Sequence, residues 1–184
     1  MSVLLTRLPS RMPSIVRRQA VVRLFRATAA AFGRDMPDLS GLSREQCLLE
    51  YARFTAQQAE QALCCGENLP GLQERLYQNA YRLSWIPGRL LGVRSAGDVV
   101  ALGRVLYDLL DIAFQGESTG EIVISRCYFS SFYSPEVCQV MSAMDSGLLA
   151  GLAGAGDLVF THRITERHAC CRAHFVLAAN QEAL

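Results

Sequence analysis

The first two-thirds of the chain carry apolar side chains at the three- and four-residue spacing that predicts amphipathic helices. An arginine-studded segment near residues 14–32 shows this spacing first. Ser43, with Gln46 three residues later, forms a capping-box pattern that predicts the start of a second helix. Apolar residues follow at helical spacing, and Gly66 is typical of the end of such a helix.

Two further helices are expected before the pattern changes. The third covers about residues 72–85, because Pro87 and the glycine after it are typical of a helix end. Ser95 with Asp98 is another capping box. It predicts a fourth helix, which the apolar spacing carries to an end at Gly116.

Beyond residue 120 the chain alternates between strand and helix patterns. Residues 121–129 are rich in β-branched and aromatic side chains and predict a strand. A serine, Pro135 and an acid then form a helix start, and this helix is expected to reach about Leu152. Residues 157–165 and 169–178 predict two more strands, close enough in sequence to pair as a hairpin.

These elements predict an α+β fold, in which about four N-terminal helices are followed by a β-α-β-β unit with a small, mainly antiparallel sheet. We divide the chain into a basic N-terminal extension or helix at residues 1–34 and a single α+β domain at residues 35–184. The unit that carries the chemistry lies at residues 121–177.

Charge is unevenly distributed along the 184 residues, although the formal net charge is only +1. Residues 1–34 contain seven arginines and no acid, whereas residues 35–184 carry a net charge of −6. The near-neutral total gives no electrostatic case for a nucleic-acid partner. The chain has no lysine, which excludes Schiff-base chemistry on a lysine amine.

The basic residues 1–34 have two interpretations. An arginine-rich, acid-free amphipathic segment resembles an organellar transit peptide, but it can also be a first helix that lies on the acidic remainder. Charged residues interrupt every apolar run before it could span a bilayer or form a secretory signal. Seven cysteines, an odd number, therefore indicate free thiols in a reduced, cytoplasmic compartment.

Residues 121–177 gather the side chains best suited to nucleophilic, redox or metal chemistry. They hold four of the seven cysteines and all three histidines: Cys127, Cys138, Cys170, Cys171, His162, His168 and His174. On the helix that Pro135 begins, Cys138 and Asp145 lie two turns apart on one face. Asp145 stands in an apolar stretch, where an acid is costly to bury without a purpose or a partner.

Strand alternation places the remaining thiols. Cys171 shares a face with the apolar Ala173 and Phe175, so it is expected to face inward, away from Cys170. Cys127 is expected to lie on the face of the first strand that also carries Phe129. If the sheet packs against the Pro135 helix, then the side chains predicted to converge beneath it are Cys127, Cys138, Asp145 and Cys171.

Such a cluster supports several chemistries. Cys138 or Cys171 could be a thiolate nucleophile, with Asp145 as the general acid and base that activates water. Cys127, Cys138 and Cys171 could instead hold a metal, for which zinc or iron is the candidate, although no C-x-x-C motif is present. His168, in the turn before the last strand, is a candidate proton carrier. The alternative that these cysteines only pack in the core stays open.

The motif residues in this unit resemble the L-2-amino-thiazoline-4-carboxylic acid hydrolase family. The shared pattern is C-x-F at Cys127, P-E-x-C at Pro135, the acid Asp145, and C-x-x-x-F at Cys171, within about residues 121–176. The resemblance implies hydrolytic opening of a thiazoline ring to an N-carbamoyl-cysteine. A more distant similarity to vinyl-reductase-type sensor domains implies binding of a hydrophobic or tetrapyrrole-like molecule without catalysis.

We therefore expect a hydrolase-like protein that acts on a small heterocyclic or C–N bond through a cysteine and aspartate site. The alternatives are a non-catalytic module that binds a small molecule or a metal, and an interaction protein whose cysteines only pack. Apolar faces in the helical half could support a homodimer. Residues 1–34 could make a peripheral contact with an anionic membrane surface.

Overall fold

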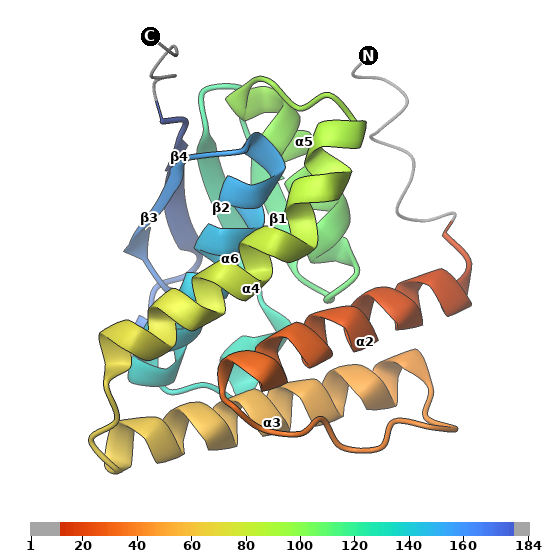
Figure 1. The fold of residues 1–184 in the computed structure, drawn as a ribbon. Coiled ribbons are helices and arrows are strands. Elements are labelled where there is room, and N and C mark those ends of the chain that lie inside the picture. Colours follow the sequence, from red (N-terminus) through yellow and green to blue (C-terminus); the bar gives the residue numbers. More distant parts are fainter. Residues whose placement is uncertain (1–11, 179–184) are drawn as a thin grey trace, which may run out of the picture.

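The computed structural model describes residues 12–178, and helices precede strands as the sequence pattern predicts (Figure 1). The first four helices described are α2 (Ser14–Ala31), α3 (Arg44–Cys64), α4 (Leu69–Leu90) and α5 (Ala96–Asp108). The elements that follow are β1 (Ala113–Gly116), β2 (Glu121–Arg126), η2 (Tyr128–Ser131), α6 (Pro135–Ala153), β3 (Asp157–His162), η3 (Ile164–Glu166) and β4 (Cys171–Val176). The predicted α+β class is confirmed.

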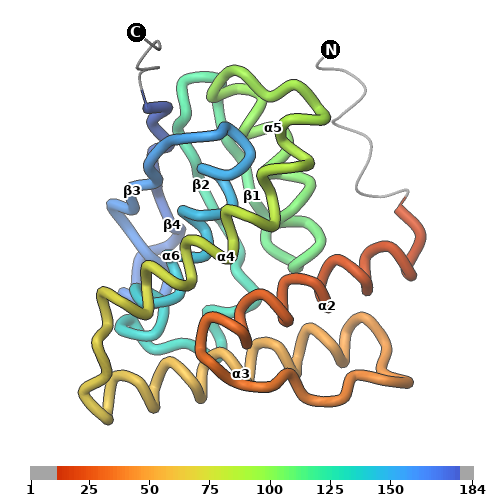
Figure 2. Tube along the Cα trace, in the orientation of Figure 1, coloured from red at the N-terminus to blue at the C-terminus, as the bar shows by residue number. Residues whose placement is uncertain are grey.

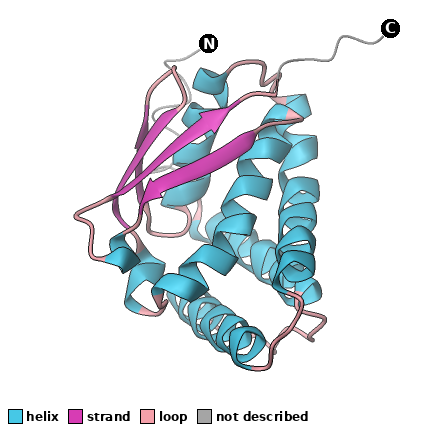
Figure 3. Cartoon of the chain, turned by 90° about the vertical axis from the view of Figure 1, so that its left-hand side faces the viewer, coloured by secondary structure: helices cyan, strands magenta, loops and turns pink. Residues whose placement is uncertain are grey.

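The four described strands form one antiparallel sheet in the order β1-β2-β4-β3. The helices pack on one side of this sheet, as the turned view in Figure 3 shows. Along β4, Cys171, Ala173 and Phe175 are buried, whereas the residues between them are more exposed. The inward orientation predicted for Cys171 is therefore confirmed, because successive side chains of a strand point to opposite faces.

Local sequence explains where the helices begin. The hydroxyl of Ser43 accepts a hydrogen bond from the backbone of Gln46, and Ser95 and Asp98 make the same arrangement, so both predicted capping boxes are confirmed. Ser134 caps α6, and a proline occupies the first turn, where its missing N–H costs nothing. The site-bearing helix thus begins where the sequence predicts.

The predicted end of α4 is wrong, since this helix continues through Pro87 to Leu90. Gly92 has a φ of 65° and the backbone of Val93 donates to the carbonyl of Gly88, which is the hydrogen-bonding pattern of a glycine-terminated helix. Proline removes only one helical hydrogen bond, and packing of the last turn against α6 keeps the helix intact. At Gly88 a β-carbon would lie 2.3 Å from the carbonyl oxygen of Leu152 on α6.

The predicted fourth helix is also too long. α5 ends at Asp108, a turn follows, and Ala113–Gly116 form the edge strand β1 instead. Asp111 has a φ of 56°, a left-handed conformation that breaks the helix. Arg44 stabilises this turn, because its guanidinium donates to the carbonyl of Leu109 and to the carboxylate of Asp111. That contact spans more than 60 residues and cannot be read from local spacing.

The strands are shorter than predicted. β2 ends at Arg126, so Cys127 lies in the turn into η2 and does not share a strand face with Phe129. The serine at position 130 stabilises this turn by donating to the carbonyl of Cys127. β3 likewise ends at His162, before the short η3 segment.

The basic first helix packs on the rest of the protein. α2 and α3 lie side by side at one end of the molecule (Figure 2), and Val21 and Phe25 of α2 are fully buried. Arg17 pairs with Asp108, and Arg18 donates to backbone carbonyls near Leu42. The described part of residues 1–34 is thus bound to the protein itself, and residues 1–11 lie outside the described range. Across residues 12–178 no helix is long and apolar enough to cross a membrane.

Candidate functional site

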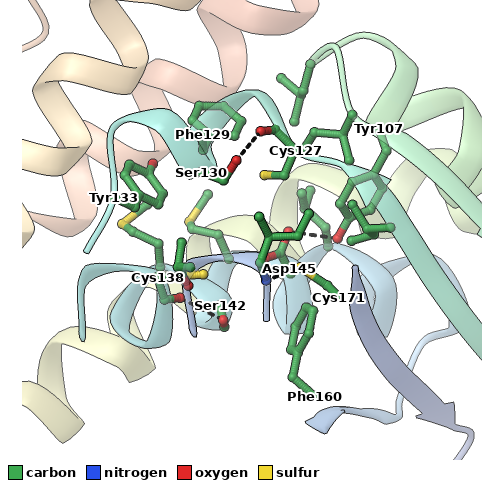
Figure 4. Close-up of a pocket in the computed structure, with 18 of the residues that line it drawn as sticks. Tyr107, Cys127, Phe129, Ser130, Tyr133, Cys138, Ser142, Asp145, Phe160 and Cys171 are labelled. Carbon is green, nitrogen blue, oxygen red and sulfur yellow. Dashed lines mark hydrogen bonds between the residues drawn. The ribbon is translucent and has the colours of Figure 1, made fainter. Parts of the chain in front are cut away.

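One pocket lies against α6 and is lined by all four residues that the sequence predicts to converge (Figure 4). Cys138 and Asp145 come from α6, Cys127 from the residue before η2, and Cys171 from the start of β4. Most of the remaining lining is leucine, isoleucine, methionine and aromatic side chains. The pocket therefore combines one acid and three thiols with an apolar wall.

Asp145 is the only acid among the described residues that line this pocket. The hydroxyl of Tyr107 donates a hydrogen bond of 2.7 Å to its Oδ1. Burial raises the pKa of Asp145 to about 6, against the opposing effects of the Tyr107 hydrogen bond and the positive charge of Arg163. At neutral pH the carboxyl is therefore mostly ionised, yet close to the pH at which a proton can be exchanged.

The second carboxylate oxygen of Asp145 remains available. Within residues 12–178 the only hydrogen bond that reaches this carboxyl is the one from Tyr107 to Oδ1. Asp145 is half-buried, and it lines the pocket. Oδ2 can therefore accept a proton or a hydrogen bond from a molecule in the cavity.

Tyr107 is a site residue that the sequence analysis did not identify. It lies on α5, is 2% exposed, and its ring stacks on Phe114 of β1 with centroids 4.7 Å apart. These contacts hold the hydroxyl against Asp145. In the sequence Tyr107 stands at core spacing among leucines and valines, so nothing local distinguishes it from a packing residue.

Arg163, the residue just before η3, is the cation whose positive charge lowers the pKa of Asp145. Its guanidinium lies 4.7 Å from the ring centroid of Phe160 and donates a long hydrogen bond of 3.4 Å to the hydroxyl of Ser142. Phe160 and Ser142 both line the pocket. Arg163 thus supplies positive charge beside the cavity and favours the ionised form of Asp145.

The three pocket thiols are held in their neutral form. Burial raises the pKa of Cys127 to about 12, and it also raises the pKa values of Cys138 and Cys171. The negative charge of Asp145 acts in the same direction on all three. A thiolate is the reactive form of cysteine, so the resting pocket does not favour a cysteine nucleophile.

The histidines lie outside this pocket. His168 is exposed, and its ring contacts that of His162 with centroids 4.6 Å apart. His174 is near Glu121, with its Nδ1 3.1 Å from the carboxylate, and its side chain is 42% exposed. The structure does not bring the predicted proton carrier His168 together with Asp145.

A metal centre is not supported by this geometry. In the described part of the chain no group of three or more histidine, cysteine, aspartate or glutamate side chains is arranged to hold a metal ion. Cys127, Cys138 and Cys171 line one cavity without forming such a group. We therefore do not assign the zinc or iron site that these three residues could suggest.

The cavity is small, with a volume of about 80 Å³. An engineered cavity that holds one benzene molecule is about 150 Å³. A tetrapyrrole therefore does not fit this cavity, and of a ring substrate only the reacting atoms could lie inside it.

No protein-family model, curated protein or solved structure matches this chain. The resemblance to the thiazoline hydrolase family therefore depends on the motif residues alone, of which the cysteines and Asp145 meet in one pocket.

Proposed function

We propose that the protein hydrolyses a small heterocyclic or other non-peptide C–N substrate, with Asp145 as the group that transfers the proton. The observation that supports this most is the Asp145 carboxyl itself, which is hydrogen-bonded by Tyr107 in a small apolar pocket and has a pKa of about 6. Carboxyls with a pKa raised toward neutrality by burial are suited to general acid–base catalysis.

The reaction consistent with this site begins with a water molecule beside Asp145. Asp145 takes a proton from the water as the water oxygen bonds to the electrophilic carbon of a C=N group, and the electron pair of that bond moves to nitrogen. The carboxyl returns this proton to that nitrogen. The new hydroxyl then gives its proton to Asp145 as the C=O bond forms and the C–S or C–N bond breaks, and Asp145 passes that proton to the departing sulfur or nitrogen. One water is added across the substrate, and Asp145 is regenerated.

Tyr107 and Arg163 have supporting roles in this proposal. The Tyr107 hydrogen bond occupies Oδ1 and leaves Oδ2 for the water. Arg163 keeps the carboxyl ionised before the reaction and offers its charge to the carboxylate of a substrate of the thiazoline class. The neutral thiols of Cys138 and Cys171 contribute to the apolar wall, and water is the nucleophile.

The test is hydrolysis of L-2-amino-thiazoline-4-carboxylate and a panel of small cyclic amidines by the full chain. Asp145→Asn preserves the shape of the side chain, removes its basicity, and should lower kcat/KM by about 10²–10⁴-fold. The matched control is Asp157→Asn, which changes an exposed acid at the start of β3 and should leave the rate unchanged.

Two results would contradict the proposal: a wild-type protein that hydrolyses none of the panel, or full activity in Asp145→Asn. Cys138→Ser and Cys171→Ser distinguish water from a cysteine thiol as the nucleophile. Both variants should retain most of the activity if water attacks the substrate. A loss in either variant as large as that in Asp145→Asn would assign the attack to a thiol.

The second candidate function is binding of a small apolar molecule without catalysis. The neutral thiols and the mainly apolar lining favour it. Native mass spectrometry of the purified protein would then reveal a bound compound that Met141→Glu, a charge placed in the lining, displaces. Absence of turnover together with such a compound distinguishes this function from hydrolysis.

A further inference from the structure

The C-terminal end of α4 exposes large apolar side chains to solvent. Trp85, Ile86, Leu90 and Leu91 are 37%, 58%, 82% and 48% exposed. They occupy two successive turns of one helix end, beside α5 (Figure 1). Ile86 and Leu90 are one turn apart and share a face of the helix, and four large apolar side chains exposed within seven residues are typical of an interaction site.

Arginines surround these side chains. Arg82, Arg89 and Arg94 are all exposed, and the guanidinium of Arg89 lies 4.9 Å from the ring centroid of Trp85. Among residues 12–178 no ion pair engages any of these three guanidinium groups. The α4 end, defined as these three arginines and the four apolar residues, is therefore both apolar and positively charged.

Few acids lie near these arginines in the sequence. The sequence contains no aspartate or glutamate between Glu74 and Asp98. The carboxylate of Asp98 is already engaged, since it accepts hydrogen bonds from the backbone of Arg94 and from the backbone and hydroxyl of Ser95. Asp98 offsets part of the charge of Arg94, and the three arginines of the α4 end leave a net positive charge for an anionic partner.

The apolar surface continues from the α4 end into a groove. Pro87, next to Ile86, lines a hollow between α4 and α5 together with Leu83, Leu106 and Leu109. The exposed Arg23 of α2 lies at the same groove. The surface that combines apolar side chains with arginines therefore includes residues of α2, α4 and α5.

We propose that the α4 end docks on the surface of an anionic lipid bilayer. Tryptophan, leucine and arginine together on one helix end match the interface, where aliphatic and indole groups enter the acyl boundary and guanidinium groups meet lipid phosphates. A second copy of the chain is a poorer occupant. A twofold contact through the α4 end would place its arginines against those of the copy.

The test is co-sedimentation of the full chain with vesicles of phosphatidylcholine alone and of phosphatidylcholine mixed with phosphatidylserine. Binding should require phosphatidylserine and weaken with salt. Leu90→Asp should abolish it, and Arg82→Gln with Arg89→Gln should weaken it by about fivefold for each arginine. Val159→Asp is the matched control, because Val159 is 55% exposed on the sheet and should not affect binding.

Equal binding of wild type and Leu90→Asp, equal binding to neutral vesicles, or no vesicle binding would each overturn the proposal. Light scattering across a range of protein concentrations identifies the other occupant. A dimer that Leu90→Asp disperses, in a protein that ignores vesicles, would assign the α4 end to self-association and overturn membrane docking.

Discussion

At the scale of single residues, Asp145 determines the electrostatics of the pocket. Its carboxyl lies among apolar side chains, and the Tyr107 hydrogen bond only partly compensates the lost hydration. The same negative charge favours the protonated form of the thiols around it. The acid and the cysteines therefore cannot be considered separately, because ionising one disfavours ionising the others.

Asp145 should make the protein less stable as the pH rises. Its pKa is 3.8 ordinarily and about 6 when folded, so the folded state binds the proton more tightly than the unfolded chain. That contribution is fully present below about pH 3 and lost as the pH rises through 6. From this group alone, the free energy of unfolding should fall by about 2 kcal/mol between pH 4 and pH 7.

Urea unfolding of wild type and Asp145→Asn at several pH values measures this contribution as a difference. The difference is needed because Asp38, Glu45, Asp98 and Glu136 have lowered pKa values and stabilise the fold in the opposite direction, as the pH rises. The variant should gain stability relative to wild type above pH 6. Parallel plots of stability against pH for the two proteins would contradict the prediction, because they would show that Asp145 has the same pKa in the folded and unfolded states.

Tyr107→Phe should raise the pKa of Asp145 further, because the lost hydrogen bond stabilises the charged carboxylate. A hydrogen bond to a charged group contributes about 1.5 kcal/mol or more, which corresponds to about one pKa unit. Carbon NMR of the labelled carboxyl measures the shift. Tyr128→Phe is the control, since Tyr128 does not line the pocket, and an unchanged pKa in Tyr107→Phe would contradict the assigned contact.

At the scale of elements, close contact between α4 and α6 positions the site-bearing helix. Ala80 and Ser84 of α4 face Gly147 and Gly151 of α6, and the Ser84 hydroxyl donates to the carbonyl of Leu148. A β-carbon at Gly147 would lie 2.2 Å from the carbonyl oxygen of Tyr77. Small residues thus allow the backbones of α4 and α6 to touch. This contact fixes the position of α6, the helix that carries Asp145.

Gly147→Ala should therefore destabilise the protein by about 3 kcal/mol or more, because a backbone oxygen cannot yield as a side chain can. Thermal and urea unfolding measure the loss. Gly97→Ala on α5 is the matched control, since its nearest neighbour would lie at an ordinary 3.4 Å and alanine favours a helix. Equal stability of the two variants would contradict the packing described.

Helix starts were predictable because each depends on residues three apart, as at Ser43 and Ser95. The ends of α4 and α5 were not, although α3 ends just before Gly66 and α6 near Leu152 as the sequence predicts. The end of α4 beyond Pro87 depends on contact with α6, and the early end of α5 depends on Arg44 of another helix. Contacts between elements outweigh a local preference of a few kcal/mol, so the ends follow the packing.

At the scale of the whole molecule, the thiols divide by depth. Cys64 and Cys65, at the end of α3, are exposed, whereas Cys47 and Cys171 are buried. Thiol titration of the native protein should show two fast cysteines, and the pocket thiols should react last because burial raises their pKa values. Cys64→Ser with Cys65→Ser should remove the fast phase. A fast phase that survives both this change and Cys170→Ser, which alters a half-buried thiol outside the pocket, would place a reactive thiol in the pocket.

The sequence alone determined the class of fold, the starts of α3, α5 and α6, and the shared helix face of Cys138 and Asp145, because each depends on spacing within about ten residues. The start of α4 at Leu69 lies three residues before the predicted one. The sequence could not reveal that Tyr107 donates a hydrogen bond to Asp145 or that Cys127 follows the end of β2. Nor could it reveal that His168 lies outside the pocket. Those depend on how distant elements pack. Burial then raised the pKa of one acid and kept three thiols neutral, since the free energy of a charge is set by its surroundings and not by its neighbours in sequence.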